Sequence, residues 1–221
     1  NTVQCVSYTR ADGTPVAFLD EDDMSSDDAS STASQQSIKA YVDAAGGGIT
    51  SISNTAITAI TNIDVTGFVS GTYDNYEVWI SNGQPGNDGV LLEMETSTDG
   101  SSTFDVGASD YTWAMLTVDE AGSTLPVADN DDTEININGN VSVGNAANEN
   151  LSVKISVFSP ETTEFTVFTW AGLFRGTTTG GTMFNGGGDR QSAADVDALR
   201  FHWSAGDWVA QGAIQFLGIA Q

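Results

Sequence analysis

The chain has 221 residues, and its 30 acidic and six basic side chains give a net charge of −24. Such a charge repels both a nucleic-acid backbone and an anionic membrane surface, so we expect neither as a partner. The 39% of hydrophobic residues exclude disorder over the whole chain, yet no run reaches the roughly 20 apolar residues of a membrane span. The single cysteine, Cys5, excludes an intramolecular disulfide framework.

Residues 1–33 are expected to form an N-terminal arm. Segments 3–8 and 16–19 alternate weakly, and the turn residues 11–15 between them favour a small hairpin. Residues 20–28 carry too much charge and too few apolar side chains to pack, which indicates a tether. The first residues lack the basic start of a signal peptide, so we expect synthesis in the cytoplasm.

A short amphipathic helix is predicted over residues 34–45, before the three glycines 46–48. Thr32 and Gln35 fit a capping box. The apolar residues that recur on one face of this helix are Ile38, Tyr41, Val42 and Ala45. A helix this short is marginal in water, so the face must be buried, either against copies of the chain or across its own β-domain. We favour copies of the chain, because no neighbouring helix follows in the sequence.

Residues 49–63 form a connector in which isoleucines mostly fall three positions apart. This spacing fits neither a helix nor a strand. It would place Ile57 and Ile60 along an axis shared by several chains, and an ordinary surface connection is the alternative.

From residue 64 to residue 221 the pattern is all-β, with turn residues between short apolar segments. The absence of helices between these segments predicts an antiparallel β-sandwich, jelly-roll-like in type. In the last aromatic strand Leu199, Phe201 and Trp203 share one face, and His202 lies on the other. The expected strands are 64–68, 76–81, 90–95, 112–118, 134–137, 151–158, 164–173, 198–203 and 211–219, and the glycine run 186–188 is expected to be a turn.

Residues that support catalysis are scarce. His202 is the one histidine, and no Gly-x-Ser-x-Gly turn accompanies it, so we expect a structural or interface role and no catalytic residues. No cofactor is expected, although Asp129, Asp131 and Glu134 are spaced as oxygen ligands for calcium. Trp208, in a Ser-Ala-Gly-Asp-Trp turn, is the tryptophan expected near a loop surface, where it would bind a sugar ring.

Two stretches resemble known proteins. Residues 19–24 (LDEDDM) through 34–43 (SQQSIKAYVD) resemble a segment that recurs in virion proteins of tailed bacteriophages, especially marine and cyanobacterial phages, where it precedes a β-rich domain. The closing run 198–219 is similar to the last hairpin of those domains.

This resemblance implies a non-enzymatic virion surface protein, typically a homotrimer, of the capsid decoration, head fibre or short tail fibre type. The arm would dock on capsid or tail proteins, and residues 34–63 would form a trimerising helix and connector. The alternative is a tail-fibre receptor-binding module that recognises a host surface glycan. A polysaccharide depolymerase is the third hypothesis, ranked below the other two.

Overall fold

The computed structural model describes residues 9, 13, 15–16, 18–19, 32–44, 48–68, 71–160, 163–176 and 180–220. The chain divides into two compact units, Asn1–Gly48 and Ile49–Gln221. We call the second unit the sandwich domain.

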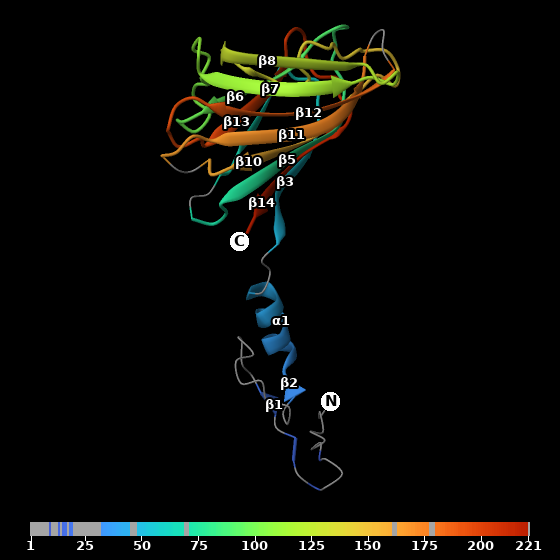
Figure 1. Cartoon of the computed structure of the whole chain (residues 1–221). Helices are drawn as coiled ribbons and strands as arrows, with labels where there is room; N and C mark the ends of the chain where they lie inside the picture. The colour runs from blue at the N-terminus through green and yellow to red at the C-terminus, as the bar shows by residue number, and fades with distance from the viewer. Residues whose placement is uncertain are drawn as a thin grey trace. The chain divides into compact units, whose positions relative to one another are not determined.

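The first unit contains the predicted helix, α1 (Gln35–Ala44), preceded by the two-residue strands β1 (Phe18–Leu19) and β2 (Thr32–Ala33), which pair in parallel (Figure 1). The helix cap differs from the predicted capping box, because Thr32 lies in β2. Ser34 takes the cap: its Oγ accepts the Ser37 N–H at 3.0 Å, and its carbonyl accepts the Ile38 N–H at 3.0 Å. The expected strand 3–8 and tether 20–28 lie outside the described residues.

The sandwich domain consists of two antiparallel sheets, which confirms the predicted all-β sandwich (Figure 1). The large sheet runs in the order β3 (Ile49–Ala56), β14 (Ala213–Ile219), β5 (Asn75–Gly83), β10 (Leu151–Phe158), β11 (Val167–Arg175), β12 (Gly181–Arg190), β7 (Tyr111–Val118) and β8 (Thr124–Asp132). The small sheet runs in the order β4 (Asn62–Thr66), β13 (Ala198–Trp203), β6 (Leu92–Ser97) and β9 (Ile135–Asn136). The jelly-roll part of the expectation stays a prediction.

The sandwich domain begins earlier than the expected boundary at residue 64. The connector 49–63 contributes a whole strand, β3, which pairs with the C-terminal strand β14. Backbone hydrogen bonds to β14 stabilise β3, although almost all of its side chains are exposed. An exposed Ser- and Thr-rich edge strand shows no regular apolar period, which explains why the pattern looked like a connector.

The core lies between the two sheets and is built from alternating residues. In β10 the inward side chains Leu151, Val153, Ile155 and Val157 are all buried. Aromatic rings fill the space between the sheets; for example, Tyr76 stacks on Phe216 with ring centroids 5.2 Å apart. A continuous core of this kind supplies most of the stability of an antiparallel sandwich.

Strand β12 was missed, because its three consecutive glycines were interpreted as a turn. They lie inside the strand, where Gly186 pairs with Trp170 of β11 and Gly188 pairs with Trp113 of β7. A Cβ at Gly186 would lie 2.5 Å from Cζ2 of Trp170. Gly186 therefore gives room to the indole of Trp170, and a Cβ at Gly188 would lie 2.5 Å from the Thr112 carbonyl oxygen, so these glycines have a packing role and do not form a turn.

The outer face of the large sheet keeps several apolar side chains in solvent. Strand β11 lies in the interior of the large sheet and is buried on one face only. Phe168 and Trp170 point into the core, whereas Val167 and Leu173 are exposed. The outward face of β11 is therefore open to solvent in this single chain.

Candidate functional site

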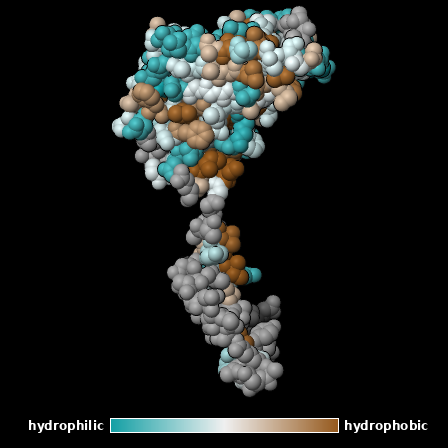
Figure 2. Space-filling model, viewed as in Figure 1, coloured by the Kyte–Doolittle hydropathy of each residue, from teal (hydrophilic) through white to brown (hydrophobic). Residues whose placement is uncertain are grey.

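The predicted self-association face of α1 is exposed. Ile38, Tyr41 and Val42 have exposed fractions of 50%, 46% and 60%, and Figure 2 shows hydrophobic surface over this helix. We call these three residues the α1 stripe. Ala45, the fourth predicted member, lies outside the described residues.

The two connector isoleucines have different environments. Ile57 is 5% exposed and belongs to the core of the sandwich domain, and its N–H donates to the Gly212 carbonyl at 3.0 Å. Its assignment to an interface between chains is therefore wrong, because its side chain already packs within its own domain. Ile60 is 46% exposed, so its place at an interface stays a prediction.

Trp208 was expected near the surface as a ligand platform, and this expectation is wrong. Its side chain is 1% exposed and packs against Trp203, with ring centroids 4.8 Å apart. Pro85 and Trp208 form a β-bridge, and the Trp208 N–H donates to the Ile60 carbonyl at 2.9 Å. The turn thus directs the indole inward, so no ring face is available for a sugar.

The expected calcium residues do not form a ligand set. Asp129 and Asp131 lie in β8, an edge strand, and the Asp131 N–H donates to Asp129 Oδ1 at 3.1 Å. Glu134 accepts a hydrogen bond from Thr133. Among the described residues, no group of three or more His, Cys, Asp or Glu side chains could hold a metal ion. Acidic side chains on an edge strand instead discourage pairing with another sheet edge.

A buried charge cluster lies on the outer side of the small sheet. His202 of β13 lies between two glutamates of β6: its Nδ1 is 3.4 Å from Glu93 Oε2, and its Nε2 is 3.2 Å from Glu95 Oε1. The two carboxylate side chains are 10% and 11% exposed, and that of His202 is 17% exposed. We call these three residues the His202 cluster. Since both ring nitrogens face acceptors, the contacts favour the imidazolium and leave neither nitrogen to activate a serine.

Burial and charge shift the protonation of this cluster. Burial raises the pKa of Glu93 from 4.5 to about 7, and the charges of Glu134, Asp132 and Glu95 add to this rise while that of His202 opposes it. Burial alone would lower the pKa of His202, but the hydrogen bond and charge of Glu95 outweigh it, so that this pKa is raised. The cluster therefore holds protons near neutral pH that an unfolded chain would release.

The sequence placed His202 on the outward face of its strand but did not single out its partners. His202 and Glu93 face each other across β13 and β6, which are more than 100 residues apart in the chain. Arg200, the next outward residue, pairs with Asp64 of β4 at 2.8 Å and 2.9 Å. The sequence does show that Glu93 and Glu95, two positions apart, lie on the same face of a strand. It does not show the register between β6 and β13 that brings these glutamates to His202.

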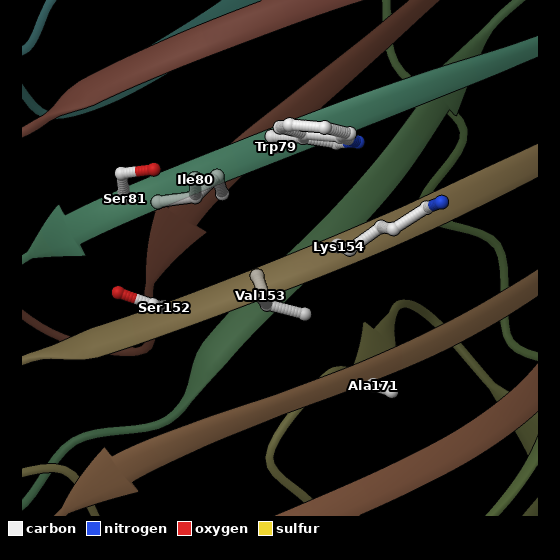
Figure 3. Close-up of a pocket in the computed structure, with 7 residues that line it drawn as sticks. All are labelled: Trp79, Ile80, Ser81, Ser152, Val153, Lys154 and Ala171. Carbon is white, nitrogen blue, oxygen red and sulfur yellow. The ribbon is translucent and has the colours of Figure 1, made fainter.

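A shallow hollow on the outer face of the large sheet contains the exposed tryptophan. Its volume is about 240 Å³, and Figure 3 shows Trp79 and Ser81 of β5 beside Ser152 and Lys154 of β10. The remaining lining residues are Ile80, Val153 and Ala171. Trp79 is 36% exposed, whereas the other four tryptophans of the chain, all in the described residues, are 1–3% exposed. We call this feature the Trp79 hollow.

Polar neighbours fix the Trp79 ring. Its Nε1 donates to Glu77 Oε2 at 2.9 Å, and the Lys154 ammonium lies 5.7 Å from the ring centroid while it pairs with Glu77. The sequence did hold the signal for this position, since Tyr76, Val78 and Ile80 alternate with Trp79 and so place it on the outward face.

The sequence matches no protein-family model and no curated protein. Within the described residues, the one helix is too short to cross a bilayer.

Proposed function

We propose that this chain is a non-enzymatic structural protein of a bacteriophage virion. In this proposal α1 assembles three copies, the arm docks on other virion proteins, and the sandwich domain is displayed on the particle surface. The observation that carries the proposal is the exposed α1 stripe, Ile38, Tyr41 and Val42, on a helix of ten residues. A helix of this length is marginal in isolation, and joining its apolar face to the same face of other copies would stabilise it.

The size of the stripe predicts how strongly it associates. Burying a fully exposed aliphatic side chain stabilises by about 1.5–3 kcal/mol, so three half-exposed side chains contribute roughly 3 kcal/mol per chain. Three chains then gain about 9 kcal/mol, which is of the same order as the cost of immobilising them. Assembly through α1 should therefore depend on concentration and be sensitive to a single polar substitution.

The charge of the chain supports an apolar contact of this kind. At a net charge of −24, copies repel one another over most of their surface, so the uncharged α1 stripe is where contact between copies is least opposed.

The contacts of His202 support the non-enzymatic part of the proposal, because both of its ring nitrogens are engaged within the sandwich domain.

Sedimentation velocity at micromolar concentration tests the assembly. We expect a trimer for the natural chain and a monomer for the double variant Ile38→Ser and Val42→Ser. Gln36→Ser on the opposite side of α1 is the matched control, since it changes helix propensity in the same direction and should leave the trimer intact.

Association with particles is tested separately. An antibody against the sandwich domain should label intact phage particles from a lysate that contains this protein, and the chain should remain with them through a density gradient. Recovery of the chain in the soluble fraction alone contradicts the virion role.

A further inference from the structure

We infer that the Trp79 hollow is a binding site for a neutral carbohydrate. The inference goes beyond the proposed structural role and does not depend on trimer formation. It starts from the one tryptophan that the fold leaves in solvent, at 36% exposed, whereas the other four are 1–3% exposed.

The N–H group of the indole is engaged within the chain, so a ligand meets its apolar ring. Nε1 is already bonded to Glu77, so a ligand has no ring donor to satisfy. The axial C–H bonds on one side of a pyranose ring match a flat aromatic surface of this kind, and the hydroxyl groups of the sugar then point outward to polar neighbours. Ser81 and Ser152 lie at one end of the hollow and the Lys154 ammonium at the other, as Figure 3 shows.

The charge of the site favours a neutral ligand. Lys154 and Glu77 pair with each other, so the hollow is locally balanced, while the whole chain carries −24. A phosphate or a nucleotide would be repelled by that field. A sugar hydroxyl, in contrast, accepts a hydrogen bond from the Lys154 ammonium, which lines the hollow, without adding charge.

The size and setting of the hollow fit one sugar ring of a longer chain. Its 240 Å³ is below the roughly 300–1,000 Å³ of pockets that enclose drug-sized molecules. The row of outward residues continues from Lys154 to Ala171 and Asn185, whose small or polar side chains leave the sheet open for neighbouring sugar units. The pairing of β10 with β5 also shifts register between Leu151 and Val153, and the Ser152 hydroxyl at this irregularity accepts the Asn82 N–H at 2.9 Å.

A glycan array of neutral oligosaccharides, probed with the full chain, identifies the ligand. Titration of the retained oligosaccharide is then followed by tryptophan fluorescence and by protection from acrylamide quenching, because Trp79 is the indole that acrylamide reaches. We expect saturable binding with protection of one tryptophan. Trp79→Ala should weaken binding at least tenfold, and Trp79→Phe should weaken it less, since a smaller aromatic face remains.

Met183→Ala is the matched control, because Met183 is 63% exposed on β12 of the same sheet and does not line the hollow. It should bind as the natural chain does. Circular dichroism and thermal unfolding confirm that each variant is folded. The inference is overturned by any of three results: no neutral glycan is retained, Trp79→Ala binds unchanged, or Trp79 is shielded from acrylamide in the free assembly because copies cover it.

Discussion

The His202 cluster makes the stability of the fold depend on pH in a direction that can be measured. The pKa of Glu93 is about 7 in the folded chain and 4.5 as the ordinary value. The folded state therefore binds a proton that the unfolded state has lost. The resulting stabilisation is fully present below pH 4.5 and disappears as the pH rises through about 7. His202, whose pKa is also raised, acts in the same direction: its contribution is present below its ordinary pKa of 6.5 and is lost above its folded pKa.

The size of this pH-dependent stabilisation follows from the pKa shift of Glu93. A change from 4.5 to about 7 corresponds to roughly 3 kcal/mol. Residual contact with solvent and screening by salt reduce this value, so we expect the natural chain to lose roughly 1–3 kcal/mol of unfolding free energy through Glu93 between about pH 5 and about pH 8.

Urea unfolding of the full chain at fixed protein concentration and ionic strength, followed by circular dichroism, measures this loss. Glu93→Gln keeps the shape of the side chain and removes its titration. The variant should match the natural chain at the acidic end and exceed its stability at the basic end. Glu120→Gln, at an exposed position, should show the pH dependence of the natural chain. A constant difference between Glu93→Gln and the natural chain across this pH range would refute the reasoning.

Two further substitutions test the packing of the sandwich. Gly186→Ala introduces a Cβ 2.5 Å from Trp170 and should cost about 1–3 kcal/mol by thermal or urea unfolding, whereas Gly187→Ala, with its nearest atom at 3.3 Å, should cost clearly less; equal costs would contradict the packing role of the glycine run. Trp208→Ala removes a 1% exposed indole from its contact with Trp203 and should cost about 3–5 kcal/mol, and a loss within experimental error would show that the ring is not part of the core.

Much of the sandwich was predictable because its strands alternate locally. The predicted segment 151–158 matches β10 at both ends, since Leu151, Val153, Ile155 and Val157 all face one core. The same rule put Leu199, Phe201 and Trp203 on one face of β13, and all three are buried. The local alternation of apolar and polar residues is sufficient to predict a strand where one face packs in the core and the other face is polar.

The missed strands lack the alternation of apolar and polar residues that identifies a strand from sequence. Strand β3 is an edge strand with almost all of its side chains exposed, whereas the glycines of β12 are set by residues on adjacent strands. Gly186 is a glycine because Trp170 occupies the space beside it, and the pair is separated by a turn and a full strand length. The end of strand β8 was predicted to be an acidic loop, because its exposed side chains include Asp129 and Asp131.

The candidate sites show the same limit. The prediction that Trp208 lies near the surface followed from the turn residues beside it, yet the fold turns Trp208 inward and leaves Trp79 outward. The partners of His202 depend on the register between β13 and β6, which a single sequence does not specify. The stripe on α1, in contrast, follows from spacing within one helix and was found directly.

The mass of the chain in solution tests self-association through α1 most directly. Sedimentation equilibrium or native mass spectrometry of the full chain should give a species of about three times 23.1 kDa at micromolar concentration, reduced to a single chain by Ile38→Ser with Val42→Ser and unaffected by Gln36→Ser. A natural chain that stays at 23.1 kDa throughout this range, or an assembly that survives the double substitution, would contradict the account.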